Sequence, residues 1–230
     1  AVASGETAPT IAGDIRFGSG NDLLDIADGT VTGNVGFGAG NNQLALSGDA
    51  VQSGAITFGA GADKMALTGT SAFSGSVDFG GGADSLTLGG TSRFSGSLTN
   101  ASGLAVNVDG GMLNIQGKAT IGSLDVSQAG VLAVTLNKDA SIGTGITVAG
   151  DASFEKGATL MLNLTDVTSA EGRYVVLTAN SLKGASGITT NSDLLPFLYK
   201  GTVAGDAPAN ELVVDVQRRT AQELGLNRSQ

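Results

Sequence analysis

The chain has 230 residues, of which 37 are glycine and only 3 are proline, and its formal net charge is −9 at pH 7. It contains no cysteine and no histidine, which excludes a disulfide framework, a Ser-His-Asp triad and nearly every zinc site. The acidic balance argues against nucleic acid as a partner, and no apolar run reaches the roughly 20 residues of a membrane-spanning helix.

Four similar phrases follow one another in the first part of the chain. Each begins with Phe-Gly and ends in alternating apolar residues, and their starts lie 20, 21 and 21 residues apart. The phrases are "FGSGNDLLDI" (17–26), "FGAGNNQLAL" (37–46), "FGAGADKMAL" (58–67) and "FGGGADSLTL" (79–88). A second phrase precedes the later copies as "TGNVGF", "SGAITF" and "SGSVDF". This regular self-similarity is typical of repeat architectures.

The pattern inside each repeat predicts short strands. Apolar residues recur every second position, as in a β-strand with one buried face, and Gly, Asn, Asp, Ser and Thr separate the runs as turn residues do. One such unit cannot bury its inward face alone, so it must stack on its neighbours. We therefore predict an all-β fold, a parallel β-helix with about 20–21 residues per turn, in which each strand pairs with its counterpart one turn on.

Stacking of the repeats places equivalent residues about 4.8 Å apart along the axis, in internal columns. One column is aromatic and another is aliphatic. We expect them to consist of Phe17, Phe37, Phe58 and Phe79, and of Leu24, Leu44, Met65 and Leu86.

The chain becomes less repetitive after residue 98, although short alternating runs continue. We divide it into a stem (1–149), a C-terminal capping β region (150–216) and a final segment (217–230). Two strands, 172–182 and 210–216, flank a segment that contains Pro196 and Pro208 and that we predict to be irregular. The residues that we assign to the cap are Phe154, Leu160, Leu162, Tyr174 and Val176, and the larger residues Phe197 and Tyr199 fall in the same region. In the final segment, Thr220 and Glu223 have capping-box spacing and favour a short helix.

An ordered series of phrases links residues 98–230 to a known family. These phrases are "GGMLNI", "AGVLAVTL", "ITVAGDASFEKGATLMLNL", "EGRYVVLTANSLKG" and "NELVVDVQRRTAQELGLN". Their order resembles the end of an autotransporter passenger, the exported part of a type V secretion protein. The resemblance implies a right-handed parallel β-helix with a pertactin-like autochaperone region. It also implies export through the periplasm, an extracellular or outer-membrane surface location, and a linker at 217–230 leading to a translocator barrel, which would be the chain's partner.

The acidic turn residues of the repeats raise the question of calcium. "GSGND" and "GGGAD" resemble the calcium-binding nonapeptide of RTX proteins, but that motif recurs every nine residues and this one only once per repeat. Asn42 also replaces the acid in the second copy. We expect Asp22, Asn42, Asp63 and Asp84 to form a column that accepts hydrogen bonds from turn N–H groups. Calcium at Asp22, Asp63 and Asp84 remains the alternative, and no other cofactor is expected.

The function indicated is structural and non-enzymatic: a stem with a C-terminal region that nucleates its folding. An adhesin that binds host matrix, glycans or sister cells is one alternative. A polysaccharide-active enzyme is the other, and it would need converging carboxylates. Asp14 with Arg16, and Asp78 near Arg93, are the only pairs that hint at it.

Overall fold

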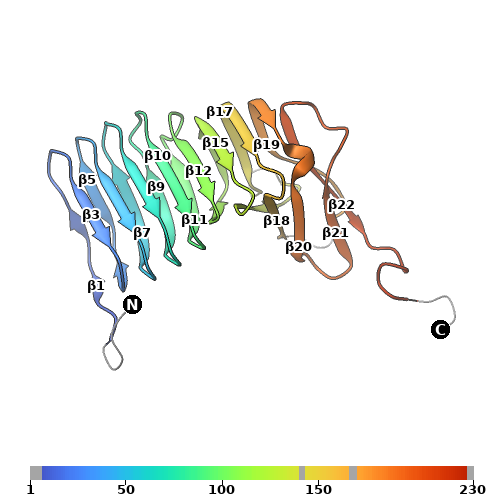
Figure 1. Cartoon of the computed structure of the whole chain (residues 1–230), viewed down its shortest axis with the longest axis horizontal. Coiled ribbons are helices and arrows are strands. Elements are labelled where there is room, and N and C mark those ends of the chain that lie inside the picture. The colour runs from blue at the N-terminus through green and yellow to red at the C-terminus, as the bar shows by residue number, and fades with distance from the viewer. Residues whose placement is uncertain (1–6, 140–142, 166–169, 227–230) are drawn as a thin grey trace.

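The computed structural model describes residues 7–139, 143–165 and 170–226. Regular structure in these residues is β, apart from the single 3₁₀ turn η1 (Ala185–Gly187). The strands stack as successive rungs along the long axis of the molecule, with the two ends of the chain at opposite ends (Figure 1). Each rung contributes strands to two long sheets.

The first sheet follows the order β1 (Thr10–Ala12), β4 (Thr30–Thr32), β7 (Val51–Phe58), β9 (Ala72–Asp78), β11 (Arg93–Thr99), β13 (Met112–Ile115), β16 (Val131–Leu136), β18 (Thr159–Leu164) and β20 (Thr189–Leu194), with β2 (Ile15–Arg16) and β5 (Val35–Gly38) at its side. The second sheet follows the order β3 (Leu23–Ile26), β6 (Gln43–Leu46), β8 (Lys64–Leu67), β10 (Ser85–Gly89), β12 (Ala105–Asp109), β15 (Ser123–Val126), β17 (Gly145–Phe154), β19 (Gly172–Lys183), β22 (Glu211–Arg218) and β21 (Tyr199–Val203), with β14 (Lys118–Ile121) paired to β17.

The repeats set the pairing register. Met65 pairs with Leu44 on one side and with Leu86 on the other, and all these pairings are parallel. The prediction of an all-β fold with parallel sheets is thus confirmed, and the arrangement is compatible with a β-helix or solenoid. The spacing of 20–21 residues does not extend along the whole chain, however. Thr159 pairs with Val131 and with Thr189, which lie 28 and 30 residues away, because the later connections are longer.

Stacked glycines explain why the early rungs are so alike. Gly75 lies in the middle of β9 between Gly54 of β7 and Gly96 of β11. Its φ is +154°, and a Cβ atom at this position would lie 1.9 Å from the carbonyl oxygen of Gly54. Only glycine allows consecutive rungs to approach so closely here. The high glycine content therefore serves close stacking between rungs.

The apolar side chains of both sheets form one continuous core that runs from Ile26 to Val216. Alternation places every second residue of a strand in this core, as in β10, where Leu86 and Leu88 are buried. The predicted boundary at 149/150 falls inside β17, and β17 pairs with β19 on both sides of it.

The C-terminal end differs from the expectation in two places. The segment predicted to be irregular contains two strands, β20 and β21; β20 has no apolar alternation, and its pairing with β18 defines it. Phe197, one of the larger residues of this region, follows Pro196 in the β20–β21 loop and is 73% exposed. Residues 221–225 form a turn and no helix. The reciprocal bonds between Thr220 and Glu223 do form, but Gly225 follows with a φ of +71° and ends the turn.

Candidate functional site

The aromatic column is an internal stack of four rings. The ring centroids of Phe17, Phe37, Phe58 and Phe79 are separated by 5.1, 4.8 and 5.4 Å, with interplanar angles of 7°, 9° and 18°. The last three rings are buried, whereas Phe17 on the outermost rung is half-buried. The aliphatic column has the predicted register: Leu44, Met65 and Leu86 are buried, and Leu24 is half-buried.

A second aromatic stack was not predicted from the sequence. Phe73 and Phe94 lie with ring centroids 5.1 Å apart. The signal was present, because "AFSGS" and "RFSGS" recur 21 residues apart. Gln52 occupies the same column one rung earlier and is fully buried, and its Nε2 donates to the carbonyl oxygen of Gly33 at 2.9 Å. The phrase "VQSGA" lies 21 residues before "AFSGS", so the repeat places Gln52 in this column, although a polar side chain does not itself indicate burial.

The polar column connects consecutive rungs through side-chain oxygens. The backbone N–H of Asp22 donates to Oδ1 of Asn42 at 3.0 Å, and that of Asn42 donates to Oδ1 of Asp63 at 2.6 Å. The N–H of Asp63 in turn donates to Oδ1 of Asp84 at 2.9 Å. These side chains therefore accept from a turn N–H, as expected, but the N–H belongs to the preceding rung.

Two further polar columns run in the opposite direction. The N–H of Asn34 donates to Oδ1 of Asp14 at 2.9 Å, and the N–H of Asn41 donates to Oδ1 of Asn21 at 2.8 Å. Here each side chain accepts from the following rung. The turns are thus tied to one another by hydrogen bonds of both directions, which fixes their register.

Asp63 and Asp84 are unusual because they are 0% and 2% exposed. Burial raises the pKa of both carboxyl groups above the ordinary value, and the charge of Asp63 raises the pKa of Asp84 further. A bond donated by a backbone N–H group acts against the rise in the pKa of each carboxyl group, and for Asp63 the side chain of Asn42 acts against it as well. Within residues 7–139, 143–165 and 170–226, no group of three or more acidic, cysteine or histidine side chains could hold a metal ion. Asp22, Asp63 and Asp84, the residues considered for calcium, thus form no such group.

The residues considered for polysaccharide chemistry do not form an acid pair. Asp14 and Arg16 make an exposed ion pair at 3.8 Å. Asp78 accepts bonds from the N–H of Gly80 and from Nδ2 of Asn100. It pairs in register with Thr99, at the opposite end of β11 from Arg93, so the expected proximity of Asp78 and Arg93 is wrong. The extended strand between the two residues separates them.

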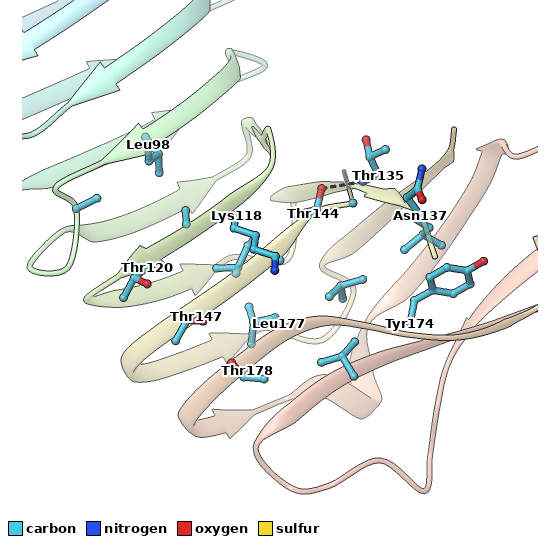
Figure 2. A pocket seen from close by; sticks show the side chains of 18 of the residues that line it. Leu98, Lys118, Thr120, Thr135, Asn137, Thr144, Thr147, Tyr174, Leu177 and Thr178 are labelled. Carbon is cyan, nitrogen blue, oxygen red and sulfur yellow. Dashed lines mark hydrogen bonds between the residues drawn. The ribbon is translucent and has the colours of Figure 1, made fainter. Parts of the chain in front are cut away.

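A groove of about 1250 Å³ is lined by β14, β17 and β19 of the second sheet and by the ends of β11 and β16 of the first sheet (Figure 2). Thr120, Thr147 and Thr178 line it and are register partners on adjacent strands. Lys118 also lines the groove, and its side chain makes no ion pair with any described residue. The sequence reading did not single out this surface, since its parts lie on rungs of unequal length.

The C-terminal closure places the predicted cap residues in the core. All five are buried: Phe154, Leu160, Leu162, Tyr174 and Val176. Pairing becomes antiparallel between β19 and β22 and between β22 and β21. β21 lies so close to the last apolar layer that a Cβ atom at Gly201 would be 2.1 Å from Cδ1 of Leu162. The hairpin therefore packs directly against the end of the core.

Ion pairs on the outer surface support this closure. Nε of Arg173 on β19 lies 3.0 Å from Oδ1 of Asp215 on β22, and the guanidinium also pairs with Asp206. Arg173 holds the pKa of the Asp206 carboxyl below its usual value. The hydroxyl of Tyr174 donates to the carbonyl oxygen of Ala170 at 2.7 Å.

Comparison of the chain with protein-family models, curated proteins and solved structures finds no match. The described residues contain no helix of the length and apolar character that crossing a membrane would require.

Proposed function

We propose that this chain is the structural stem of a bacterial autotransporter passenger, a right-handed parallel β-helix whose C-terminal region nucleates folding. It is a non-enzymatic chain, exported through the periplasm and displayed at, or released from, the outer-membrane surface. A translocator barrel following the chain is its proposed partner. The ordered phrases of residues 98–230 support the family assignment, and the parallel register of the repeats supports the stem.

The change from parallel to antiparallel pairing at the C-terminal end carries this proposal. A sheet edge with unpaired N–H and C=O groups is prone to pair with other chains, and an open solenoid end exposes apolar core. Here β21 packs over the end of the core at Leu162, whereas Ile11 and Leu23 on the first rungs are 49% and 58% exposed. A region closed on one side can fold first and offer its other side to the next rung.

Two matched truncations test the order of folding. Leu212 on β22 and Leu86 on β10 are both 0% exposed, and replacing either by alanine is expected to cost about 2–5 kcal/mol. If the C-terminal region forms first, Leu212→Ala slows folding of the whole chain and Leu86→Ala mainly speeds unfolding. Stopped-flow measurements in denaturant give both rates. If Leu86→Ala slows folding more than Leu212→Ala does, or if the two variants change the folding rate equally, nucleation at the C-terminal end is rejected.

Pulsed hydrogen exchange during refolding gives a second readout on the unmodified chain. We expect the amides of β19 and β22 to become protected before those of β7 and β9. Simultaneous protection would show that the two regions fold as one unit, which contradicts a nucleating role.

The groove beside β14 favours adhesion as a second candidate function. Its row of threonine hydroxyls and the cationic Lys118 suit a glycan that carries carboxylate groups. Polygalacturonate is expected to bind saturably, uncharged dextran is not, and Lys118→Met should weaken binding. Lys64→Met is the matched control, since Lys64 is an exposed lysine on β8, outside the groove. Equal binding by both variants would place the ligand elsewhere.

A further inference from the structure

The polar column contains an asymmetry between its amide and its carboxyl members. In Asn42, Asp63 and Asp84 the Oδ1 atom accepts the N–H of the preceding rung, so these three side chains differ only in their second atom. In Asn42 the second atom is the nitrogen Nδ2. It donates to the carbonyl oxygen of Gly40 at 3.1 Å and lies 3.4 Å from that of Gly38. The amide thus closes its own glycine turn.

In Asp63 and Asp84 an oxygen takes the place of that nitrogen. Both Oδ2 atoms are buried and have no hydrogen-bond partner. The rungs are in register at this turn, where Gly61 bridges to Gly82 and Lys64 pairs with both Gln43 and Ser85. By this register the second oxygen of each aspartate corresponds to Nδ2 of Asn42, the atom that donates to the carbonyl oxygens of its own glycine turn. An ionised carboxylate in this position is desolvated and repelled.

The surroundings offer no charge that would compensate an ionised form. The elements packed around the column contribute Asp22 on the preceding side and the two aspartates themselves. The neighbouring Lys64 is exposed on the outer face of β8, and neither buried carboxyl forms an ion pair with a described residue. Like charges one rung apart disfavour simultaneous ionisation.

We propose that Asp63 and Asp84 are neutral carboxylic acids in the folded chain at pH values where an exposed aspartate is ionised, each donating its O–H to a glycine carbonyl as the Asn42 amide does. The proton comes from solvent, so the folding chain binds up to two protons. This inference does not depend on the proposed function. The contribution of these two groups therefore favours the folded stem more in acid than at neutral pH.

The sign follows from linkage. Both folded-state pKa values are raised above the ordinary 3.8. The contribution of the two O–H donors is therefore complete below the ordinary value and is lost as pH rises through the raised pKa. Between the two values, each group lowers the folding equilibrium constant by up to about tenfold per pH unit.

Asparagine substitution tests the proposal directly, because the amide supplies the donor at every pH. We expect Asp63→Asn/Asp84→Asn to raise the melting temperature above that of the parent at pH 7.5, and the difference to shrink towards pH 4. Asp25→Asn/Asp109→Asn, which alters two exposed aspartates, is the control and should show no such pH-dependent gain. A gain that is the same at both pH values, or no gain, would overturn the proposal.

Two measurements on the parent complete the test. Infrared difference spectra at pH 6 should contain the C=O band of buried protonated carboxyl groups, and each single asparagine variant should reduce it. Absence of that band would also overturn the proposal, even if a variant fails to fold. Calcium added at pH 7.5 should leave the melting temperature of the parent unchanged. A rise that the double asparagine variant lacks would mean that the carboxyl groups are ionised and hold a cation, which contradicts protonation.

Discussion

The repeat region (residues 10–109) and the C-terminal region (residues 145–218) reach a stable parallel core by different means. The first repeats one cross-section at a spacing of 20–21 residues, with columns of phenylalanine, glycine and Asx side chains. The second departs from that spacing, contains register shifts in β17–β19 and β18–β20 pairing, and ends in antiparallel strands. Equal repeats fix the pairing register, because every rung makes the same contacts. A structure made only of equal repeats would leave the core of its last rung uncovered. Closure requires a region that breaks the repeat.

The largest expected effect is in the aromatic column of the repeat region. Phe58 is 2% exposed and stacks between Phe37 and Phe79. Phe58→Asp would bury an unpaired carboxylate there, at a cost of at least about 4 kcal/mol. Urea unfolding monitored by circular dichroism measures this loss. Phe58→Leu, which keeps the site apolar, should lose far less. A Phe58→Asp variant that unfolds at the parental urea concentration would disprove the internal stack.

The next effect contrasts two aromatic residues of the C-terminal region. Tyr199 is 6% exposed and lies beneath the guanidinium of Arg218, whereas Phe197 is 73% exposed. Tyr199→Ala is expected to destabilise the chain by about 3 kcal/mol. Phe197→Ala should change stability by no more than about 0.5 kcal/mol. Thermal melts distinguish them, and equal losses would contradict the packing of the closing hairpin.

A smaller effect tests glycine stacking in the repeat region. Gly75→Ala forces a side chain into a positive φ and against the carbonyl oxygen of Gly54, at an expected cost of about 2 kcal/mol. Gly36 is the matched control, because a Cβ atom there meets nothing within 4 Å and its φ is ordinary. Gly36→Ala should leave the melting temperature within a few degrees of the parent. If both variants melt alike, rung spacing does not depend on the absence of a side chain.

The contrast between the regions also explains which parts of the fold could be predicted from the sequence. Alternation and the 20–21 residue period were enough to place Phe58 against Phe37 and Met65 against Leu86, because equal rungs repeat the same contacts. The same reasoning failed for β20, whose strand character comes from its partner and not from its own apolar pattern.

Burial of polar groups was the other limit of the sequence reading. The column of Asp63 and Asp84 was expected, but their complete burial and the direction of their bonds depend on the height of one rung above the next. The groove beside β14 joins rungs of unequal length and was not foreseen. Contacts between equal rungs can thus be predicted from the sequence. Contacts between rungs of unequal length become visible only in the structure.

The smallest expected effect on stability is in the C-terminal tail, which is held by an exposed ion pair and not by core contacts. Nζ of Lys200 lies 2.5 Å from Oε1 of Glu223 and, with the N–H of Thr220, lowers the pKa of Glu223 from 4.5 to about 2. The stabilising contribution of this lowered pKa is present above pH 4.5 and is lost as pH falls towards 2. Because the pair is partly exposed, its removal should barely change the melting temperature.

An NMR titration of the Glu223 carboxyl carbon measures this effect. Lys200→Met should move its midpoint from about 2 towards the ordinary 4.5, because Lys200 makes the largest contribution to the lowered pKa. Lys183→Met, which removes an exposed lysine that pairs with Asp151 at 3.7 Å, should leave the midpoint of Glu223 unchanged. An unchanged midpoint in Lys200→Met would mean that the turn N–H of Thr220 alone holds the carboxylate. The tail would then be ordered by its own turn, independently of the closing hairpin.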